Sequence, residues 1–306
     1  MNPPEPHVTI VIVNYGRVVD SLVCLESLAR VTYPRFSIVV VDNGSNDGST
    51  DAIERWSGRK IPVELIRNDI NLGFARGSNQ GMLHALTANT DYVFLLNNDT
   101  VVEPDVLELL VATAEQSDDI GMVGPKIYQY GKENILDSAG TRTIPWLAQG
   151  FLLGHGKVDR GQYDNPGEMP YVTGTALLVK RTVLEKIGLM DEDYFCYFED
   201  FDWGMKAREA GYRLLLAPGA VVHHRGSRTA GFGSPFYMQH MVRSRIVFAR
   251  KHIPRLLFVC AFIPYLFLYR YLRPAAILIF HRRWVHLDAL HRGIREGFVF
   301  PINSRI

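Results

Sequence analysis

Buried strands and amphipathic helices alternate along the first part of the chain. Residues 8–13 and 37–41 are almost continuous runs of Val and Ile that end in polar turn residues, a pattern typical of strands covered on both faces of a parallel sheet. Between them, apolar residues recur at helical spacing over 19–30, which predicts a βαβ unit. The same patterns predict strands at 63–67 and 92–96 and a helix at 78–88.

The alternation continues to about residue 217 with one interruption. Periodicity weakens between residues 129 and 170, and a loop of this length inside a compact domain is usually functional, as an acceptor or lid element. The remaining expected elements are helices at 106–115, 181–187 and 201–210 and strands at 122–125, 176–179 and 212–217. The pattern predicts an α/β fold in which helices flank the sheet and ligands bind at the carboxyl ends of its strands.

The last part of the chain differs from the rest. Residues 240–306 carry 12 Lys and Arg against 2 Asp and Glu, a net charge of +10, so the remainder carries −9. We therefore expect a domain of residues 1–237 and a basic, aromatic helical extension of residues 238–306. Such an extension suits an anionic partner, either a membrane face or a nucleic acid. A helical extension that packs on the acidic body is the alternative.

One segment of this extension is strongly apolar. Residues 256–269 form a run of 14 mostly apolar residues, interrupted by Pro264, and this falls short of the roughly 20 residues that a membrane span requires. Arginines surround the aromatic side chains, which favours a position among lipid headgroups. We expect residues 256–283 to lie on a membrane surface, with an oligomer or domain contact as the alternative.

Composition excludes several classes of protein. The chain has 306 residues, of which 47% are hydrophobic and 21% are charged, so it is neither disordered nor a small disulfide scaffold. Its three cysteines lie far apart in sequence, which indicates a reducing compartment. The N-terminus lacks the basic and apolar regions of a signal peptide. We therefore expect a cytoplasmic protein.

Polar clusters follow two of the predicted strands. Asp42 comes directly after one strand in Val-Val-Val-Asp-Asn-Gly-Ser, where its carboxylate can accept a hydrogen bond from the imide of uracil or thymine; an Asx turn is the alternative. Asp99 ends Phe-Leu-Leu-Asn-Asn-Asp, where an oxygen-rich strand end suits Mg²⁺ or Mn²⁺. A polar strand end that only forms a turn is the alternative there.

Two further clusters carry glycines and carboxylates. Residues 71–81 contain three glycines at four-residue spacing, which allow a ligand to approach the backbone at a helix start, whereas the dinucleotide and P-loop patterns are absent from the sequence. Glu199, Asp200 and Asp202 lie within four positions, and one of them can act as a general base. Favourable charge at a helix N-terminus explains Asp202 equally well. His223 and His224 follow a strand, and either can complete a metal site.

The order of these motifs resembles the family 2 glycosyltransferases of GT-A fold, over about residues 8–250. The likeness rests on VVVDNGSNDGS, NLGFARGSNQG, FLLNNDT, TGTALLVKR, GLMDEDYFCYFEDFDWGMKAREAGYRL and HHRG. It is most similar to the bacterial rhamnosyltransferases of cell-surface polysaccharide synthesis, in which Asn-Asn-Asp is common in place of Asp-x-Asp. The resemblance implies a GT-A, Rossmann-like fold with a mixed, mainly parallel sheet.

The resemblance also implies a reaction and a set of residues. It implies metal-dependent, inverting transfer of a sugar, rhamnose from dTDP-rhamnose, to a saccharide or lipid-linked saccharide, with a UDP- or GDP-sugar as the alternative donor. Asp200 is the expected base, with Glu199 and Asp202 as its neighbours, and Trp203 is expected to contact the acceptor. Asp99 and His224 are expected to bind Mg²⁺ or Mn²⁺. The residues expected around the nucleotide sugar are Asn14, Tyr15, Asp42, Asn43, Asn71, Gly73, Asn79, Asn98 and Arg225, with Arg228 near the diphosphate.

A protein of another class, which binds nucleic acid or membrane through the basic extension, is the competing hypothesis. It leaves the carboxylate cluster unexplained, and the sequence contains no recognised nucleic-acid-binding motif. We therefore expect no nucleic-acid partner. The expected location is the cytoplasm, peripheral on the inner face of the plasma membrane, and the oligomeric state stays open.

Overall fold

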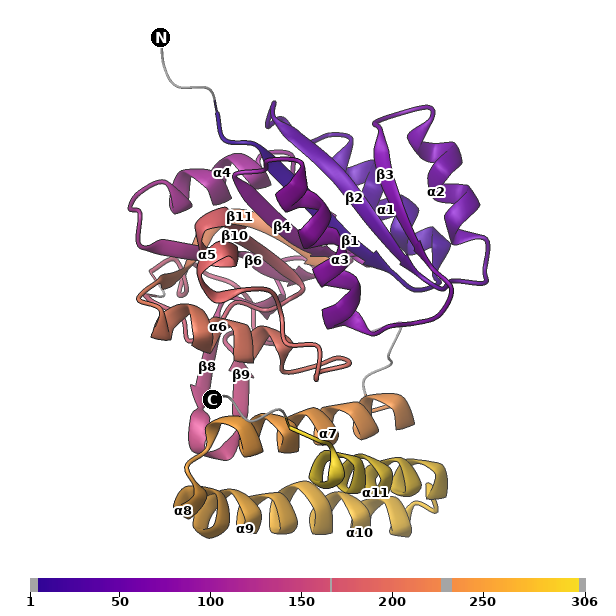
Figure 1. The fold of residues 1–306 in the computed structure, drawn as a ribbon, viewed down its shortest axis with the longest axis vertical. Coiled ribbons are helices and arrows are strands. Elements are labelled where there is room, and N and C mark those ends of the chain that lie inside the picture. Colours follow the sequence, from indigo (N-terminus) through magenta and orange to yellow (C-terminus); the bar gives the residue numbers. More distant parts are fainter. Residues whose placement is uncertain (1–4, 166, 227–232, 303–306) are drawn as a thin grey trace.

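A large mixed sheet forms the centre of the protein (Figure 1). The computed structural model describes residues 5–165, 167–226 and 233–302, and in this part of the chain nine strands form one sheet, ordered β3-β2-β1-β4-β10-β6-β11-β5 with β7 beside β6. The strands are β1 (Val8–Asn14), β2 (Phe36–Asn43), β3 (Val63–Asn68), β4 (Tyr92–Asn97), β5 (Thr100–Val102), β6 (Ile120–Gln129), β7 (Leu136–Ser138), β10 (Ala176–Lys180) and β11 (Arg213–His224).

Strand direction confirms the mixed, mainly parallel sheet. The neighbours β3, β2, β1 and β4 run parallel, as do β6 and β11. Strand β10 is antiparallel to both β4 and β6, and β5 is antiparallel to β11. Parallel neighbours end at the same edge, so Asn14 of β1 lies opposite Asp42 of β2. This edge gathers the polar strand ends that the sequence pattern singled out.

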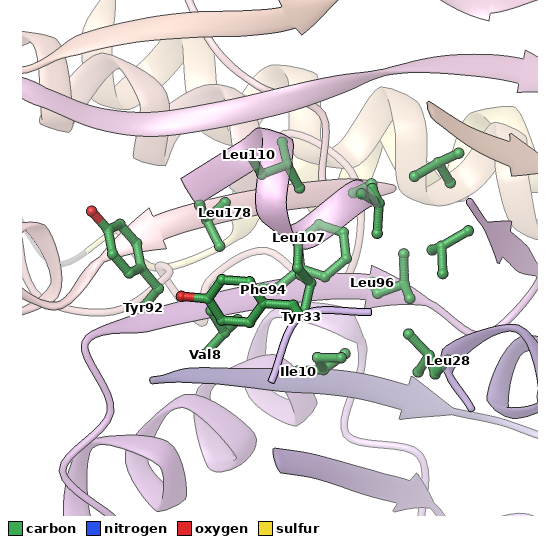
Figure 2. Close-up of a cluster of buried hydrophobic side chains, with 14 of the residues drawn as sticks. Val8, Ile10, Leu28, Tyr33, Tyr92, Phe94, Leu96, Leu107, Leu110 and Leu178 are labelled. Atoms are coloured by element: carbon green, nitrogen blue, oxygen red, sulfur yellow. The ribbon is translucent and has the colours of Figure 1, made fainter. Parts of the chain in front are cut away.

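Helices cover both faces of the sheet. They are α1 (Val18–Leu28), α2 (Ser49–Ser57), α3 (Phe74–Thr87), α4 (Val106–Ala114), α5 (Arg181–Ile187) and α6 (Glu199–Glu209). Alternate residues of β4 enter different cores: Phe94 packs with Leu107 of α4, and Leu95 packs with Met82 of α3. Figure 2 shows the first of these cores around Phe94 and Leu107. Burial on both faces explains why these strands are continuous apolar runs.

The weakly patterned stretch between 129 and 170 contains a hairpin that the sequence pattern missed. Strands β8 (Thr141–Ile144) and β9 (Gln149–Leu152) pair in antiparallel register around the short helix η1 (Pro145–Leu147). The hairpin extends from the sheet domain towards the C-terminal helices (Figure 1). Each strand has four residues, which is too short for a clear alternation of apolar and polar positions. The stretch therefore joins the two parts of the molecule.

Helices form the C-terminal part of the chain, as expected. Helix α7 (Pro235–His252) begins before the expected boundary at residue 237, and α11 (Trp284–Val299) packs against it. Between them lies one continuous helix, Arg255–Phe280, which we call the apolar helix. It comprises α8 (Arg255–Leu257), η2 (Phe258–Phe262), α9 (Ile263–Tyr265), η3 (Leu266–Leu272) and α10 (Arg273–Phe280).

The expectation that this segment is too short to span a bilayer is wrong. The apolar helix continues through Pro264 and has 26 residues, and its most apolar stretch has a mean hydropathy of 1.4 and is 11% buried. Proline lacks a backbone N–H and cannot donate an interior helical hydrogen bond, and the π-helical stretches η2 and η3 lie on either side of α9, which contains Pro264. By length and composition alone, this described helix is long enough and apolar enough to cross a membrane. Core helices of soluble proteins can meet the same two criteria.

Candidate active site

A cavity of about 470 Å³ opens at the carboxyl edge of the sheet, between the ends of β1, β2 and β4 and the start of α6. We call it the active-site cavity. Nine residues expected to bind the nucleotide sugar or metal or to act in catalysis line it: Tyr15, Asn43, Asn71, Gly73, Asn98, Asp99, Glu199, Asp200 and His224. Residues separated by more than 200 positions thus meet in one space, as the rule for ligand sites in α/β sheets predicts.

Two groups of lining residues had no assigned role in the sequence analysis. Gly174 and Thr175 come from the Thr-Gly-Thr motif before β10, and Phe195, Cys196 and Tyr197 form an aromatic loop before α6. The remaining lining residues are Val13, Phe74, Asn97 and Phe236. The Thr-Gly-Thr motif and the aromatic run were visible in the sequence, but nothing there showed that they reach the cavity.

The two carboxylates at the start of α6 owe their position to a strained turn. Tyr197 and Phe198 have φ angles of 67° and 76°, in the left-handed region that non-glycine residues rarely adopt. This turn delivers Glu199 and Asp200 to the active-site cavity. Asp200 accepts hydrogen bonds from the backbone N–H groups of Gly174 at 3.0 Å and Phe201 at 2.8 Å.

Burial governs the charge of this pair. It raises the pKa of Asp200, although the backbone N–H donors oppose the shift. Burial and then the neighbouring charge of Asp200 raise the pKa of Glu199 well above its ordinary range. Among the described residues, the Oε2 atom of Glu199 has no hydrogen-bond partner. Two carboxyl groups with raised pKa values in a cavity are typical of acid–base chemistry.

Asp99 and His224 form the second reactive pair. The Oδ1 atom of Asp99 lies 3.3 Å from Nε2 of His224, and Nδ1 of His224 lies 2.8 Å from Oδ2 of Asp137. Burial lowers the pKa of His224, but Asp137 and Asp99 outweigh it and raise the pKa to about 9. Asp137 belongs to the weakly patterned stretch, in which no site residue was predicted from the sequence.

These residues fit a divalent cation. A carboxylate and an imidazole lie side by side, and a second carboxylate orients the far nitrogen of the imidazole, which is a common arrangement around metal sites. The described residues contain no group of three or more His, Cys, Asp and Glu able to hold a metal. Asp99 and His224 would therefore supply two ligands. Mg²⁺ and Mn²⁺ commonly complete such a shell with water and substrate phosphates.

Asn14 and Asp42 lie next to the active-site cavity without lining it. Asp42 is 3% exposed and accepts hydrogen bonds from Asn14 at 2.7 Å, Ser45 at 2.5 Å and Thr50 at 2.9 Å. Asn14 in turn accepts a hydrogen bond of 3.1 Å from Asn98, which lines the cavity. In this structure the Asp42 carboxylate is occupied by protein donors, so it supports Asn98 through Asn14.

Asn79 and Arg225 also lie away from the active-site cavity. The Asn79 amide is bonded to both backbone groups of Met190, accepting at 3.0 Å and donating at 2.9 Å, which ties α3 to the loop before α6. Arg225 forms an ion pair of 2.7 Å with Asp20. Its backbone N–H donates to the carbonyl of Asp99 at 2.9 Å. Arg228 lies outside the described residues.

The roles expected of Trp203 and Asp202 need correction, because both side chains are fully buried. The Trp203 indole packs in a core and donates to the carbonyl of Gly188 at 3.0 Å, so it has no surface for an acceptor. Asp202 pairs with Lys206 at 2.5 Å and with His252 of α7. Its carboxylate therefore joins two helices and does not face the reaction.

The fold and the site together define a GT-A glycosyltransferase. Residues 9–188 match the model of glycosyl transferase family 2, which spans more than half of the chain, and the protein belongs to this family. It is an enzyme that transfers glycosyl groups. A curated relative is the N-acetylglucosaminyl-diphospho-decaprenol L-rhamnosyltransferase of Mycobacterium tuberculosis, 27% identical over an alignment of 252 residues that covers 74% of this chain and 79% of the relative.

The chain is also similar to another curated transferase and to two solved structures. The low-salt glycan biosynthesis hexosyltransferase Agl10 of Haloferax volcanii is 25% identical over 208 residues, 67% of this chain and 63% of that protein. The mannosyltransferase PcManGT of Pyrobaculum calidifontis, solved with GDP-Man and Mn²⁺, has a TM-score of 0.60 at 18% identity, over 97% of this chain and 88% of that one. S. aureus TarS has a TM-score of 0.56 at 15% identity, over 97% and 93%. These structures confirm the fold.

Proposed function

We propose that the enzyme transfers a sugar, with inversion, from a nucleoside diphosphate to a hydroxyl of a saccharide or lipid-linked saccharide. The observation that carries the proposal is that the Asp99–His224 pair and the Glu199–Asp200 pair line the same cavity. One pair suits a metal-bound diphosphate, and the other suits an acceptor hydroxyl. The rhamnosyltransferase relative favours dTDP-rhamnose as the donor and makes a UDP- or GDP-sugar the alternative.

Asp200 is the proposed base. Its carboxylate takes the proton of the acceptor hydroxyl, the acceptor oxygen forms a bond to the anomeric carbon, and the bond from that carbon to the diphosphate breaks. The electron pair of that bond leaves with the nucleoside diphosphate, so a single displacement inverts the anomeric centre. The N–H groups of Gly174 and Phe201 hold the Asp200 carboxylate in place and stabilise its charged form before the transfer.

The donor is proposed to lie between the strand ends and α3. Asn43 donates to Asn71 at 3.2 Å and to the carbonyl of Gly73 at 2.9 Å, which builds a polar wall beside the exposed ring of Tyr15. Mg²⁺ or Mn²⁺ bound by Asp99 and His224 would neutralise charge on the departing diphosphate. Asn98 has its amide fixed by Asn14 and Ser21, which suits it to orient the ribose.

Isothermal titration against dTDP, UDP and GDP, each with Mn²⁺ or with EDTA, tests the donor. We expect dTDP to bind in Mn²⁺, and Asp99→Asn to weaken that binding at least tenfold. The matched control is Asp105→Asn, because Asp105 is exposed at the start of α4. Preference for UDP or GDP would replace dTDP-rhamnose as the donor. Absence of binding to all three nucleotides would overturn the proposal.

The proposed location is the inner face of the plasma membrane. The apolar helix exposes large side chains along its length, among them Leu256, Val259, Leu268 and Phe280, and Trp284 of α11 is exposed beside them. Arginines interrupt the same surface, as is typical of segments at an anionic lipid surface. Contact with a second copy of the chain is the alternative, and vesicle sedimentation together with light scattering separates the two.

A further inference from the structure

A buried arginine lies beside the active site without a counter-ion. Arg245 of α7 is 3% exposed. It donates to the carbonyl of Ala148 and, at 3.3 Å, to Oε1 of Gln149 in the β8–β9 hairpin, and its guanidinium lies 5.1 Å from the ring centroid of Phe198. In the described parts of the chain, no carboxylate pairs with it. Burying a charge without a partner is strongly unfavourable, and a buried arginine without a counter-ion is unusual unless it has a function.

A second arginine strengthens the positive charge at this place. Arg270 of the apolar helix is half-buried, and within the described ranges it also forms no ion pair. Burial and then the positive charge of Arg270 lower the pKa of Arg245 to about 9. Arg245 and Tyr265 donate to the same oxygen of Gln149, and Arg270 follows Tyr265 by five residues, one turn later in the π-helical η3. The two positive charges therefore lie on the same side of the hairpin and favour an anion between them. Arginine suits phosphate in particular, because its planar group donates two parallel hydrogen bonds.

Phenol groups complete the cluster. Tyr265 donates to Oε1 of Gln149 at 2.5 Å. Tyr265 and Tyr237 partly oppose the lowering of the pKa of Arg245. We call Arg245, Arg270, Tyr237 and Tyr265 the arginine cluster. Its members come from α7 and the apolar helix, and the β8–β9 hairpin packs against it. This explains why the hairpin extends away from the sheet towards these helices (Figure 1).

The arginine cluster adjoins the acceptor side of the active-site cavity. The ring of Tyr237 lies 5.3 Å from the ring of Tyr197, and Tyr197 lines the cavity two residues before Glu199. Phe198 lies between Tyr197 and Glu199 in the sequence, and its ring contacts the guanidinium of Arg245. On the other side, Arg270 belongs to the helix whose surface is apolar and exposed. The cluster therefore lies between the reacting carboxylates and a surface suited to a lipid.

We propose that Arg245 and Arg270 bind a phosphate or diphosphate group of the acceptor, whose apolar chain lies along the apolar helix. The inference rests on the proposed function, because it names the class of acceptor as a lipid phosphate that carries a sugar. The phosphate is distinct from the donor diphosphate, which is assigned to Asp99 and His224. Recognition of the phosphate would place the acceptor sugar near Glu199 and Asp200.

The test is titration of the whole protein with farnesyl diphosphate and with farnesol, at saturating dTDP and Mn²⁺ so that the donor site is filled. We expect farnesyl diphosphate to bind at least tenfold more tightly than farnesol. Arg270→Gln should weaken farnesyl diphosphate binding at least tenfold and leave dTDP binding within twofold. The matched control is Arg273→Gln, because Arg273 is exposed on the same helix, and this variant should bind as the wild type does.

Several results would overturn the inference. One is farnesol binding as tightly as farnesyl diphosphate, and another is an unchanged affinity of Arg270→Gln for farnesyl diphosphate. A third is an equal loss of this affinity in Arg270→Gln and Arg273→Gln, which would indicate non-specific attraction to surface charge. Arg245→Lys keeps the buried charge but loses the planar fork, and we expect intermediate affinity with an unchanged melting temperature. If the protein binds no nucleotide, the proposed donor fails, and the same titration without nucleotide still decides the inference.

Discussion

Asp200 and Asp202 stand two residues apart in the first turn of α6, and only Asp200 reaches the active-site cavity. Asp200 is held there by two backbone N–H groups. Asp202 is fully buried and pairs with Lys206 and with His252 of α7. One carboxylate is therefore placed for chemistry, while the other fixes the helix that carries it. Replacing each by its amide should have separate effects.

Asp200→Asn should nearly abolish transfer and leave the donor bound. Loss of a positioned general base usually slows a reaction by about 10²–10⁴-fold, so we expect kcat to fall in that range while nucleotide affinity stays within twofold. Steady-state kinetics and titration with dTDP measure the two effects. Glu209→Gln is the control, because Glu209 ends the same helix and is exposed. A variant with more than a tenth of wild-type kcat would rule out Asp200 as the base.

Asp202→Asn should destabilise the fold. Breaking a buried ion pair costs about 3–5 kcal/mol, which corresponds to a fall in Tm of roughly 6–20 °C for a chain of this size. Burial raises the pKa of Asp202, but His252 and Lys206 outweigh it, so the folded pKa lies below the ordinary value of 3.8. Its stabilisation is present above pH 3.8 and is lost as the pH falls through the lowered folded pKa.

Thermal unfolding of wild type and Asp202→Asn between pH 3 and pH 8 tests this. The difference in Tm should be full at pH 5 to 8 and shrink below about pH 4. His252→Gln should lower Tm in the same direction, because it leaves Asp202 with one partner fewer. Equal Tm values for Asp202→Asn and wild type at pH 7 would show that the ion pair adds no stability.

Asp200 and Asp202 illustrate which features of this protein can be predicted from its sequence and which cannot. Alternating strands and helices, the parallel order of the first strands and the polar edge all follow from hydrophobic pattern, because burial on two faces leaves a clear signature in β1, β2 and β4. Which carboxylate of a cluster faces the cavity depends on the left-handed turn at Tyr197 and Phe198, and nothing in the residue types predicts that turn.

Contacts between distant segments were equally invisible in the sequence. Asp137 meets His224 across 87 positions, and Arg245 meets the β8–β9 hairpin across 97. Asp42 looked like a ligand-binding group because it follows a strand, yet its neighbours Asn14, Ser45 and Thr50 occupy its carboxylate. Strand-end position predicted the neighbourhood of the site correctly, but the pairing of side chains decides which of them are available to a ligand.

Glu199→Gln should make the folded protein more stable at neutral pH. Burial and the charge of Asp200 raise the pKa of Glu199 well above 4.5, so the folded protein binds this proton more tightly than the unfolded chain. Wild-type stability therefore falls as the pH rises from 4.5 towards the raised folded pKa. Glutamine does not ionise, so the Tm of the variant should exceed that of wild type by a margin that grows with pH, reaching about 2–4 °C.

Calorimetric scans of both proteins from pH 4 to pH 9 check this sign. Glu209→Gln, at the exposed end of α6, should show no such trend. A Glu199→Gln variant that melts below wild type at pH 8 would mean that the carboxylate forms a stabilising contact. Activity should fall in the same variant, which would be an instance of the usual conflict between a reactive site and stability.

Gly73→Ala should damage both the fold and the donor site. Gly73 has a φ of +88°, and a Cβ there would collide with the backbone oxygen of Phe195, which accepts a hydrogen bond of 2.7 Å from Phe74. Gly48 has a similar φ of +78° but open space around a Cβ, so Gly48→Ala isolates the conformational cost of about 1–2 kcal/mol. Chemical denaturation should give a loss for Gly73→Ala at least twice that for Gly48→Ala, and only Gly73→Ala should weaken dTDP binding.

Exposed apolar side chains on the apolar helix should bind anionic membranes. Phe267 and Leu268 are 52% and 53% exposed, so changing both to Ser removes apolar contact area and leaves the neighbouring arginines in place. We expect wild type to sediment with phosphatidylglycerol vesicles, more weakly with phosphatidylcholine, and less at high salt, because the arginines act through screened charge. The double variant should lose at least tenfold in affinity. Leu83→Ser is the control, since Leu83 is 54% exposed on α3 of the sheet domain.

Light scattering on the same proteins tests whether this surface instead contacts a second copy of the chain. If wild type is a dimer, the double variant is a monomer and neither binds vesicles, the apolar helix is a dimer interface and the membrane prediction is wrong.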